Sequence, residues 1–289
     1  MNVNYENRIV AFLDILGFRT LINISEKDNS KIVTIYEALE YLKTWEKPNE
    51  WNLDFIAIEE DAQKKGVNSF DIINKTNCTC FSDSIVVSVI VDENNIEEIM
   101  STLIANISYI GAVLLEEGIL LRGGMTLGKL IHKENGIILG QGLIDAYELE
   151  NKYSKYPRII LSDKLIQKLN YPSDKKGVKY PYHQYLKRYD DGCVGFSQLT
   201  FLQVIQSWEK MGKNQLKKSL STIKREIIKG LDISFQSPDI HEKYKWLKME
   251  YNNLIILEKE IKEKILELNE NLGDPNIHYT YTDNISYRK

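Results

Sequence analysis

Short apolar runs alternate with segments of helical periodicity from the N-terminal end through residue 165. Runs rich in Val, Ile and Phe and bounded by turn residues predict strands over 9–16, 77–81, 85–91, 118–128, 137–139 and 158–161. Apolar spacing of three and four residues predicts helices from Thr20 through 32–42, over 96–117, from Gly140 to about Asn151, and from Ser162 onward. This alternation of strands and helices predicts an α+β sandwich.

The pattern changes after about residue 200. Two long helical segments, 201–233 and 240–272, are joined by a short linker ending in Pro238 and predict an antiparallel helical hairpin. The second segment carries an apolar stripe of Trp246, Met249, Leu254, Leu257, Ile261, Ile265 and Leu268. The stripe favours packing onto the preceding domain, with a dimer contact or docking of another protein as alternatives. We therefore divide the chain into a domain over 1–199 with an insertion at about 45–73, a hairpin over 200–275 and a tail over 276–289.

Composition narrows the function classes. In a chain of 289 residues, 37 basic and 41 acidic side chains nearly cancel, and no segment combines Lys and Arg with interleaved aromatics. DNA or RNA is therefore not an expected partner, whereas small anionic ligands are compatible. No apolar run approaches the roughly 18 residues of a membrane span, and the first residues lack a signal-peptide pattern, so we expect a cytoplasmic protein without membrane contact.

The cysteines and histidines do not indicate a structural zinc site. Cys78, Cys80 and Cys193 are expected to be small buried side chains, and the four histidines have no metal-ligand spacing.

Two aspartates stand in apolar surroundings. Asp14 interrupts the run from Val10 to Phe18, and Asp83 lies between two β-rich runs, at the expected tip of a hairpin. A buried carboxylate is costly unless it is paired, hydrogen-bonded or bound to a cation. The two aspartates therefore predict a shared divalent metal and a phosphorylated substrate, with mere capping of turns as the alternative.

Four sequence elements in order resemble the class III nucleotidyl cyclases over roughly residues 7–151. They are Phe-Leu-Asp-Ile-Leu-Gly-Phe ending at Phe18, Ser82-Asp83, Leu-Arg-Gly-Gly-Met ending at Met125, and Gly140-Gln141-Gly142. The resemblance implies a ferredoxin-like βαββαβ core followed here by the C-terminal helical hairpin.

The resemblance also implies roles for particular residues. Asp14 and Asp83, with the Ile15 carbonyl, would hold two Mg²⁺ or Mn²⁺ ions, and the backbone of Leu16, Gly17 and Phe18 would receive the β- and γ-phosphates. The ribose 3′-hydroxyl would attack the α-phosphate with loss of pyrophosphate, at sites formed between two protomers of a homodimer.

Two expected side chains of the family are missing. The positions of the ribose-orienting Asn and of the transition-state Arg fall on Ile144 and Glu148. Possible substitutes for the cation are Arg122 and Arg19, with Lys187 and Arg188 as further options, although each of these is also explained as a solvated or structural residue.

The base-reading positions fall on Thr79 and Ile137, which match neither the adenine nor the guanine pattern. This departure resembles the pyrimidine cyclases of bacterial anti-phage defence, known as Pycsar. The leading hypothesis is thus a lyase that converts CTP or UTP to the 3′,5′-cyclic monophosphate, a second messenger for a downstream cyclic-nucleotide-binding effector. The alternative is a degenerate cyclase fold that binds a nucleotide or a partner without turnover; a diguanylate cyclase is disfavoured because Gly-Gly-Asp-Glu-Phe is absent.

Overall fold

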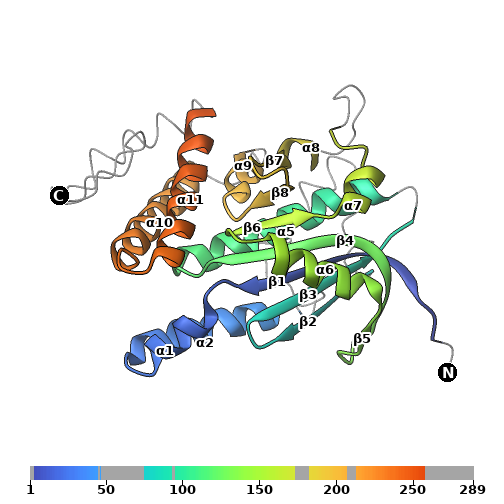
Figure 1. Cartoon of the computed structure of the whole chain (residues 1–289), viewed down its shortest axis with the longest axis horizontal. Helices are drawn as coiled ribbons and strands as arrows, with labels where there is room; N and C mark the ends of the chain where they lie inside the picture. The colour runs from blue at the N-terminus through green and yellow to red at the C-terminus, as the bar shows by residue number, and fades with distance from the viewer. Residues whose placement is uncertain are drawn as a thin grey trace.

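A mixed sheet of eight strands organises the described part of the chain (Figure 1). The computed structural model describes residues 3–44, 46, 75–92, 95–172, 182–206 and 213–257. The strands are β1 (Glu6–Ile15), β2 (Thr76–Phe81), β3 (Ser84–Ile90), β4 (Leu121–His132), β5 (Ile138–Leu139), β6 (Arg158–Leu161), β7 (Lys187–Arg188) and β8 (Val194–Ser197). Their order is β2-β3-β1-β4-β6-β8-β7, with β5 paired to β4 beside this path. The α+β class predicted from the periodicity is confirmed.

The first four strands are antiparallel to their neighbours, and β1 lies between β3 and β4. Strand β6 then adds to β4 in parallel. Because β1 is central, its odd-numbered residues, including Leu13, and its even-numbered residues, including Val10, are buried on opposite faces. The last residues of β1 are therefore held from both sides, which makes its end a rigid support for side chains.

Helices cover both faces of the sheet. They are α1 (Phe18–Ser25), α2 (Asn29–Thr44), α5 (Ile96–Glu116), α6 (Gln141–Tyr153), α7 (Asp163–Lys168), α8 (Tyr182–Tyr185), α9 (Thr200–Gln206), α10 (Lys213–Ile233) and α11 (Pro238–Leu257). The larger core lies between the sheet and helices α2, α5 and α7, whereas α6 covers the opposite face around Val10 and Val86 (Figure 1).

Helix α6 lies very close to β4 because glycines face it. A Cβ on Gly124 would stand 2.4 Å from the Ala146 carbonyl oxygen, and one on Gly128 would stand 2.7 Å from Gly142 Cα. Backbone therefore packs on backbone at this interface.

The predicted C-terminal hairpin is present as α10 and α11, which contact each other at one end of the molecule, and α10 also contacts α5 (Figure 1). Leu220, Ile223, Leu247 and Tyr251 are among the residues of the second hydrophobic cluster, which also includes Leu115 of α5. Of the predicted apolar stripe, Trp246 and Leu254 are buried, but Met249 is 45% exposed. The buried face of α11 includes Leu247, Tyr251 and Leu254 and is rotated by part of a turn from the predicted stripe. The assignment of Met249 to the buried face was therefore wrong.

Several predicted boundaries differ from the observed ones. The helical stretch after β1 is two helices, because Asp28 interrupts it and its carboxylate accepts from the Ser30 amide and hydroxyl at 2.9 and 2.7 Å. The strand expected from residue 118 begins at Leu121, since Gly118 has a left-handed φ of 76° and ends α5. Strands β7 and β8 were not predicted, because β7 consists of two basic residues, and Gly195 and Ser197 break the apolar pattern of β8.

Other predictions fall outside the described residues. These are the insertion at 45–73 apart from Glu46, the continuity of the helix across 207–212, the end of the hairpin beyond Leu257 and the tail over 276–289. Cys78, Cys80 and Cys193 form no disulfide and are partly buried, so the expectation that they are buried holds only in part.

One described helix, α5, is long and apolar enough to cross a membrane by length and composition. The expectation that no apolar stretch reaches this length was therefore wrong. However, 61% of the apolar window is buried inside the fold, as in the core helix of a soluble protein.

Candidate functional site

The two aspartates come together where β1 ends beside the β2–β3 turn. Asp14 is the penultimate residue of β1 and pairs across the sheet with Ser84, whose hydroxyl donates to Asp14 Oδ1 at 3.2 Å. Asp83 lies in the turn, after Ser82 with its left-handed φ of 52°. The Ile15 amide donates to the Asp83 carbonyl at 3.0 Å, which ties the turn to the end of β1.

Burial raises the pKa of the Asp14 carboxyl above its usual range. Arg122 opposes this rise through its charge and hydrogen bond, and the negative charge of Asp83 adds to it. The side chain of Asp14 is 18% exposed, so solvent still reaches part of it. The two carboxylates are close enough to repel each other, which is the electrostatic condition for attracting a cation.

Arg122 lies directly opposite Asp14 on β4. Its Nε and Nη2 donate to Asp14 Oδ2 at 3.3 and 3.2 Å, and Nη1 donates to the Ser154 carbonyl at 3.3 Å. Nη2 also lies 2.7 Å from Glu150 Oε1 on α6. The guanidinium therefore holds Asp14 and Glu150 together on the α6 face of the sheet.

Glu150 is a site residue that the sequence analysis did not single out. It is only 2% exposed, and burial raises the pKa of its carboxyl to about 7, with Arg122 lowering it and Asp14 raising it. Gly142, Ala146 and Glu150 recur every four residues and are the buried positions of α6. A charge in line with two small buried residues was the signal that could have revealed it.

The predicted phosphate-binding turn follows Asp14 immediately. Leu16 donates its amide to the Leu120 carbonyl at 2.8 Å, and Gly17 adopts φ 79°, which favours glycine. The first bonds of α1 run from the Thr20 and Leu21 amides to Gly17, so the Phe18 and Arg19 amides have no acceptor within the helix. A helix start of this kind attracts anions.

The two predicted base-pocket residues differ in exposure. Thr79 is buried, and its hydroxyl bonds to His132 Nε2 at 2.9 Å. Ile137 is 52% exposed. The turn before Ile137 lies beside Thr79, because a Cβ on Gly136 would be 3.8 Å from Thr79 Cγ2. Thus the Thr79 hydroxyl already has a hydrogen-bond partner within the chain, whereas the exposed Ile137 side chain is available to contact a ligand or another chain.

The other suggested cations do not share the position of Arg122. Arg19 is exposed on α1, Lys187 forms an ion pair with Glu250 of α11, and Arg188 donates to the Gly192 carbonyl at 2.7 Å. Ile144 is half exposed on α6, and Glu148 pairs with Lys152 at 2.7 Å. Among these candidates, Arg122 alone contacts Asp14.

The donor atoms suit a hard divalent cation. Two carboxylates and a backbone carbonyl are the oxygen ligands that Mg²⁺ and Mn²⁺ prefer. Within the described ranges, no group of three or more His, Cys, Asp or Glu residues could hold a metal. A metal here would thus depend on Asp14, Asp83, backbone oxygen and a bound substrate, and it would compete with Arg122 for Asp14.

No protein-family model matches the chain, and no curated protein matches its sequence.

Proposed function

We propose that this protein is a nucleotidyl cyclase of the class III type that converts CTP or UTP to the 3′,5′-cyclic monophosphate and pyrophosphate. The observation that carries the proposal is the convergence of Asp14 and Asp83 beside the glycine turn that starts α1. The antiparallel strand order β2-β3-β1-β4, with helices between β1 and β2 and between β3 and β4, supports a ferredoxin-like cyclase core.

Asp14, Asp83 and the Ile15 carbonyl would hold one or two Mg²⁺ or Mn²⁺ ions. Such ions, when bound, favour ionisation of the ribose 3′-hydroxyl and offset charge on the phosphates. The start of α1 orients the triphosphate by placing its first amides next to Asp14. Arg122 is the cation nearest the aspartates, so it is our candidate for stabilising negative charge that develops on the α-phosphate.

Homodimerisation is part of the proposal. Exposed apolar side chains lie on α6 and on or just before β5, namely Ile137, Leu139, Ile144 and Tyr147. The Tyr147 ring also packs edge-on against Phe12, two residues before Asp14, with ring centres 5.3 Å apart. A second protomer that covers this surface would bury the apolar area and could shield the exposed part of the Asp14 side chain.

Turnover of each nucleotide tests the proposal. Purified protein with Mn²⁺ or Mg²⁺ is incubated with ATP, GTP, CTP and UTP separately, and cyclic products and pyrophosphate are quantified. We expect product from CTP or UTP. Asp14→Asn and Asp83→Asn should each reduce turnover by at least about a thousandfold, since each removes a charge that would bind metal.

Asp145→Asn is the matched control. Asp145 is also a partly exposed carboxylate, but it lies on the first turns of α6 and pairs with Lys164 at 2.8 Å. This variant should retain wild-type turnover. Product from ATP alone would exclude the pyrimidine preference but leave cyclisation standing, whereas absence of product from all four nucleotides would contradict the proposal.

The Arg122 ion pairs favour a second candidate, a nucleotide-binding protein without turnover. In the described conformation Arg122 neutralises Asp14, where an active enzyme would have metal. Metal-dependent binding of a triphosphate without pyrophosphate release would support this candidate.

A further inference from the structure

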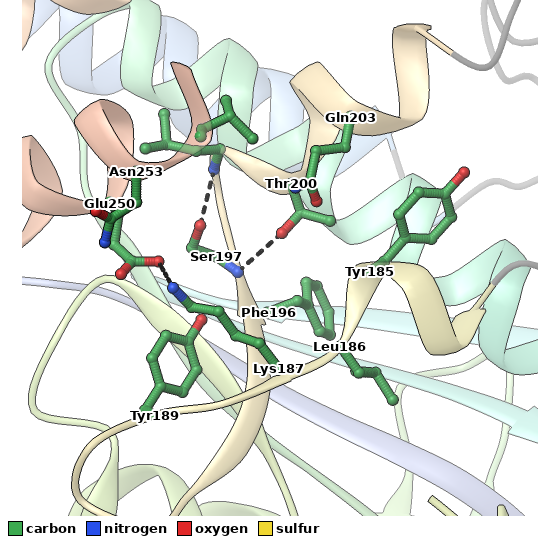
Figure 2. Close-up of a pocket in the computed structure, with 12 residues that line it drawn as sticks. Tyr185, Leu186, Lys187, Tyr189, Phe196, Ser197, Thr200, Gln203, Glu250 and Asn253 are labelled. Atoms are coloured by element: carbon green, nitrogen blue, oxygen red, sulfur yellow. Dashed lines mark hydrogen bonds and ion pairs between the residues drawn. The ribbon is translucent and has the colours of Figure 1, made fainter. Parts of the chain in front are cut away.

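A cavity of about 180 Å³ lies between the sheet edge formed by β7 and β8 and the C-terminal helix α11 (Figure 2). Its walls include Tyr185 from α8, Phe196 from β8 and Glu250 from α11. It has no residue in common with the aspartate site. The cavity is smaller than the roughly 300 Å³ at which pockets for drug-sized ligands begin, so it suits a single small molecule.

Tyr189 supplies an unsatisfied polar group to this cavity. Its side chain is buried, and among the described residues its hydroxyl has no hydrogen-bond partner. Burial first, and then the charge of Glu250, raise the pKa of this phenol well above its usual range, so the hydroxyl keeps its proton as a donor. Figure 2 shows the hydroxyl pointing toward the Lys187–Glu250 pair. A buried donor without an acceptor is costly, and a ligand that offers an acceptor would remove that cost.

The ring of Tyr189 cannot turn away easily. Arg158 Cζ lies 4.6 Å from the ring centre and Lys187 Nζ lies 4.7 Å from it. Arg158 is itself buried and forms an ion pair with Asp191. The hydroxyl is therefore held in place by groups that have their own partners.

The charge in the cavity selects a neutral ligand. Lys187 and Glu250 form an ion pair across its wall, so neither is available to neutralise a charged molecule. The Ser197 hydroxyl accepts from the Leu199 amide at 3.3 Å and keeps its own proton to donate. Beside these donors, the Glu250 carboxylate offers an acceptor, and Tyr185 and Phe196 offer aromatic surface.

We propose that this cavity binds a neutral planar heterocycle of nucleobase size, with a ring nitrogen or carbonyl oxygen accepting from Tyr189. Amide-like heterocycles carry donors and acceptors on one edge and apolar faces, which matches these walls. Because the sheet and α11 both contact the cavity, a bound molecule stabilises the docked hairpin. The site is independent of the proposed cyclase activity.

Calorimetry and thermal unfolding of the full chain, with uracil, cytosine, adenine and nicotinamide as probes, test the proposal. We expect saturable one-to-one binding of at least one probe and a matching rise in Tm. Tyr189→Phe retains the ring and removes only the hydroxyl, so it should fold and bind that probe at least about tenfold more weakly.

Three variants complete the test. Tyr244→Phe removes a hydroxyl of α11 that donates to the Gly118 carbonyl at 3.2 Å outside the cavity, and Asp14→Asn alters only the aspartate site, so both should bind as wild type. Asn253→Trp places a large ring at the exposed mouth and should block binding without disturbing the core. Absence of binding by all four probes at millimolar concentration, or unchanged affinity in Tyr189→Phe, would overturn the proposal.

Discussion

Buried ionisable residues lie on the α6 face of the sheet, and two of them have perturbed pKa values in opposite directions. Burial raises the pKa of Glu150 to about 7, whereas burial and the charge of Arg8 lower the pKa of His132 to about 4. The His132 ring bonds to the Thr79 and Ser88 hydroxyls, so it is held as the neutral base. Such shifts make the free energy of unfolding depend on pH.

The signs of the two contributions differ. The Glu150 carboxyl binds its proton more tightly in the folded state, so its contribution to stability is lost as pH rises from about 4.5 through 7. His132 binds its proton less tightly in the folded state, so its contribution is lost as pH falls from about 6.5 through 4. In the wild type these two effects oppose each other over much of the same range.

Substitution of either residue should expose the contribution of the other. As the pH rises from 5 to 8, the free energy of unfolding of Glu150→Gln should increase relative to that of the wild type by up to about 3 kcal/mol. As the pH falls from 7 to 4, the loss of unfolding free energy caused by His132→Asn should shrink by up to about 3 kcal/mol. Urea unfolding at these pH values measures both slopes. Glu148→Gln, at an exposed position, should show the wild-type slope, and a wild-type slope in Glu150→Gln would contradict the assignment.

At the scale of elements, the position of α6 depends on the glycines of β4, which have no side chain to keep the helix away. Gly124 allows the α6 backbone to approach at Ala146 and Glu150, and this approach places Glu150 within reach of Arg122. The ion pairs of Arg122 with Asp14 and Glu150 thus depend on an uncharged backbone contact between α6 and β4.

Gly124→Ala should therefore destabilise the fold and disturb the aspartate site together. The added methyl would overlap the Ala146 carbonyl, at a cost of about 1–3 kcal/mol from overpacking. Gly192→Ala is the control, because its Cβ meets nothing within 4 Å and only the left-handed φ of 84° is strained. Chemical denaturation measures both losses, and an NMR titration should show a changed Glu150 pKa only in Gly124→Ala. An unchanged Glu150 pKa in that variant would separate α6 packing from the site.

At the scale of the whole molecule, the hairpin and the sheet share buried surface. The second hydrophobic cluster joins Leu115 of α5 to residues of α10 and α11, and Tyr156 of the core stacks on Trp246 with ring centres 5.3 Å apart. We therefore expect the described core and the hairpin to unfold as one cooperative unit.

Leu247→Ala tests this coupling. The side chain is fully buried, so its truncation should cost about 2–5 kcal/mol. Met249→Ala, two residues along α11 and 45% exposed, should cost less than about 1 kcal/mol. Far-UV circular dichroism and tryptophan fluorescence should report coincident transitions for both variants, whereas a separate early transition in Leu247→Ala would show that the hairpin unfolds alone.

Local patterns in the sequence predicted most elements and the convergence of Asp14 and Asp83. Apolar periodicity identifies strands and helices because burial has the period of each element, and a charge within such a run is conspicuous. The same reasoning assigned Met249 to the buried face of α11, although its side chain is exposed. The apolar residues of this helix cover more of its circumference than the buried face does, so periodicity alone does not show which of them are buried. It also missed β7 and β8, because the two basic residues of β7 and the Val-Gly-Phe-Ser sequence of β8 contain no apolar run.

The partners of the aspartates were decided by the tertiary structure. Arg122 and Glu150 are far apart in sequence from Asp14, and only the register of β4 against β1 and the close packing of α6 bring the three side chains together. The same holds for the cavity at Tyr189, whose walls come from the sheet edge and from helices α8, α9 and α11. Sequence periodicity records how each segment buries its own side chains, whereas a site depends on contacts between segments, which only the folded chain specifies.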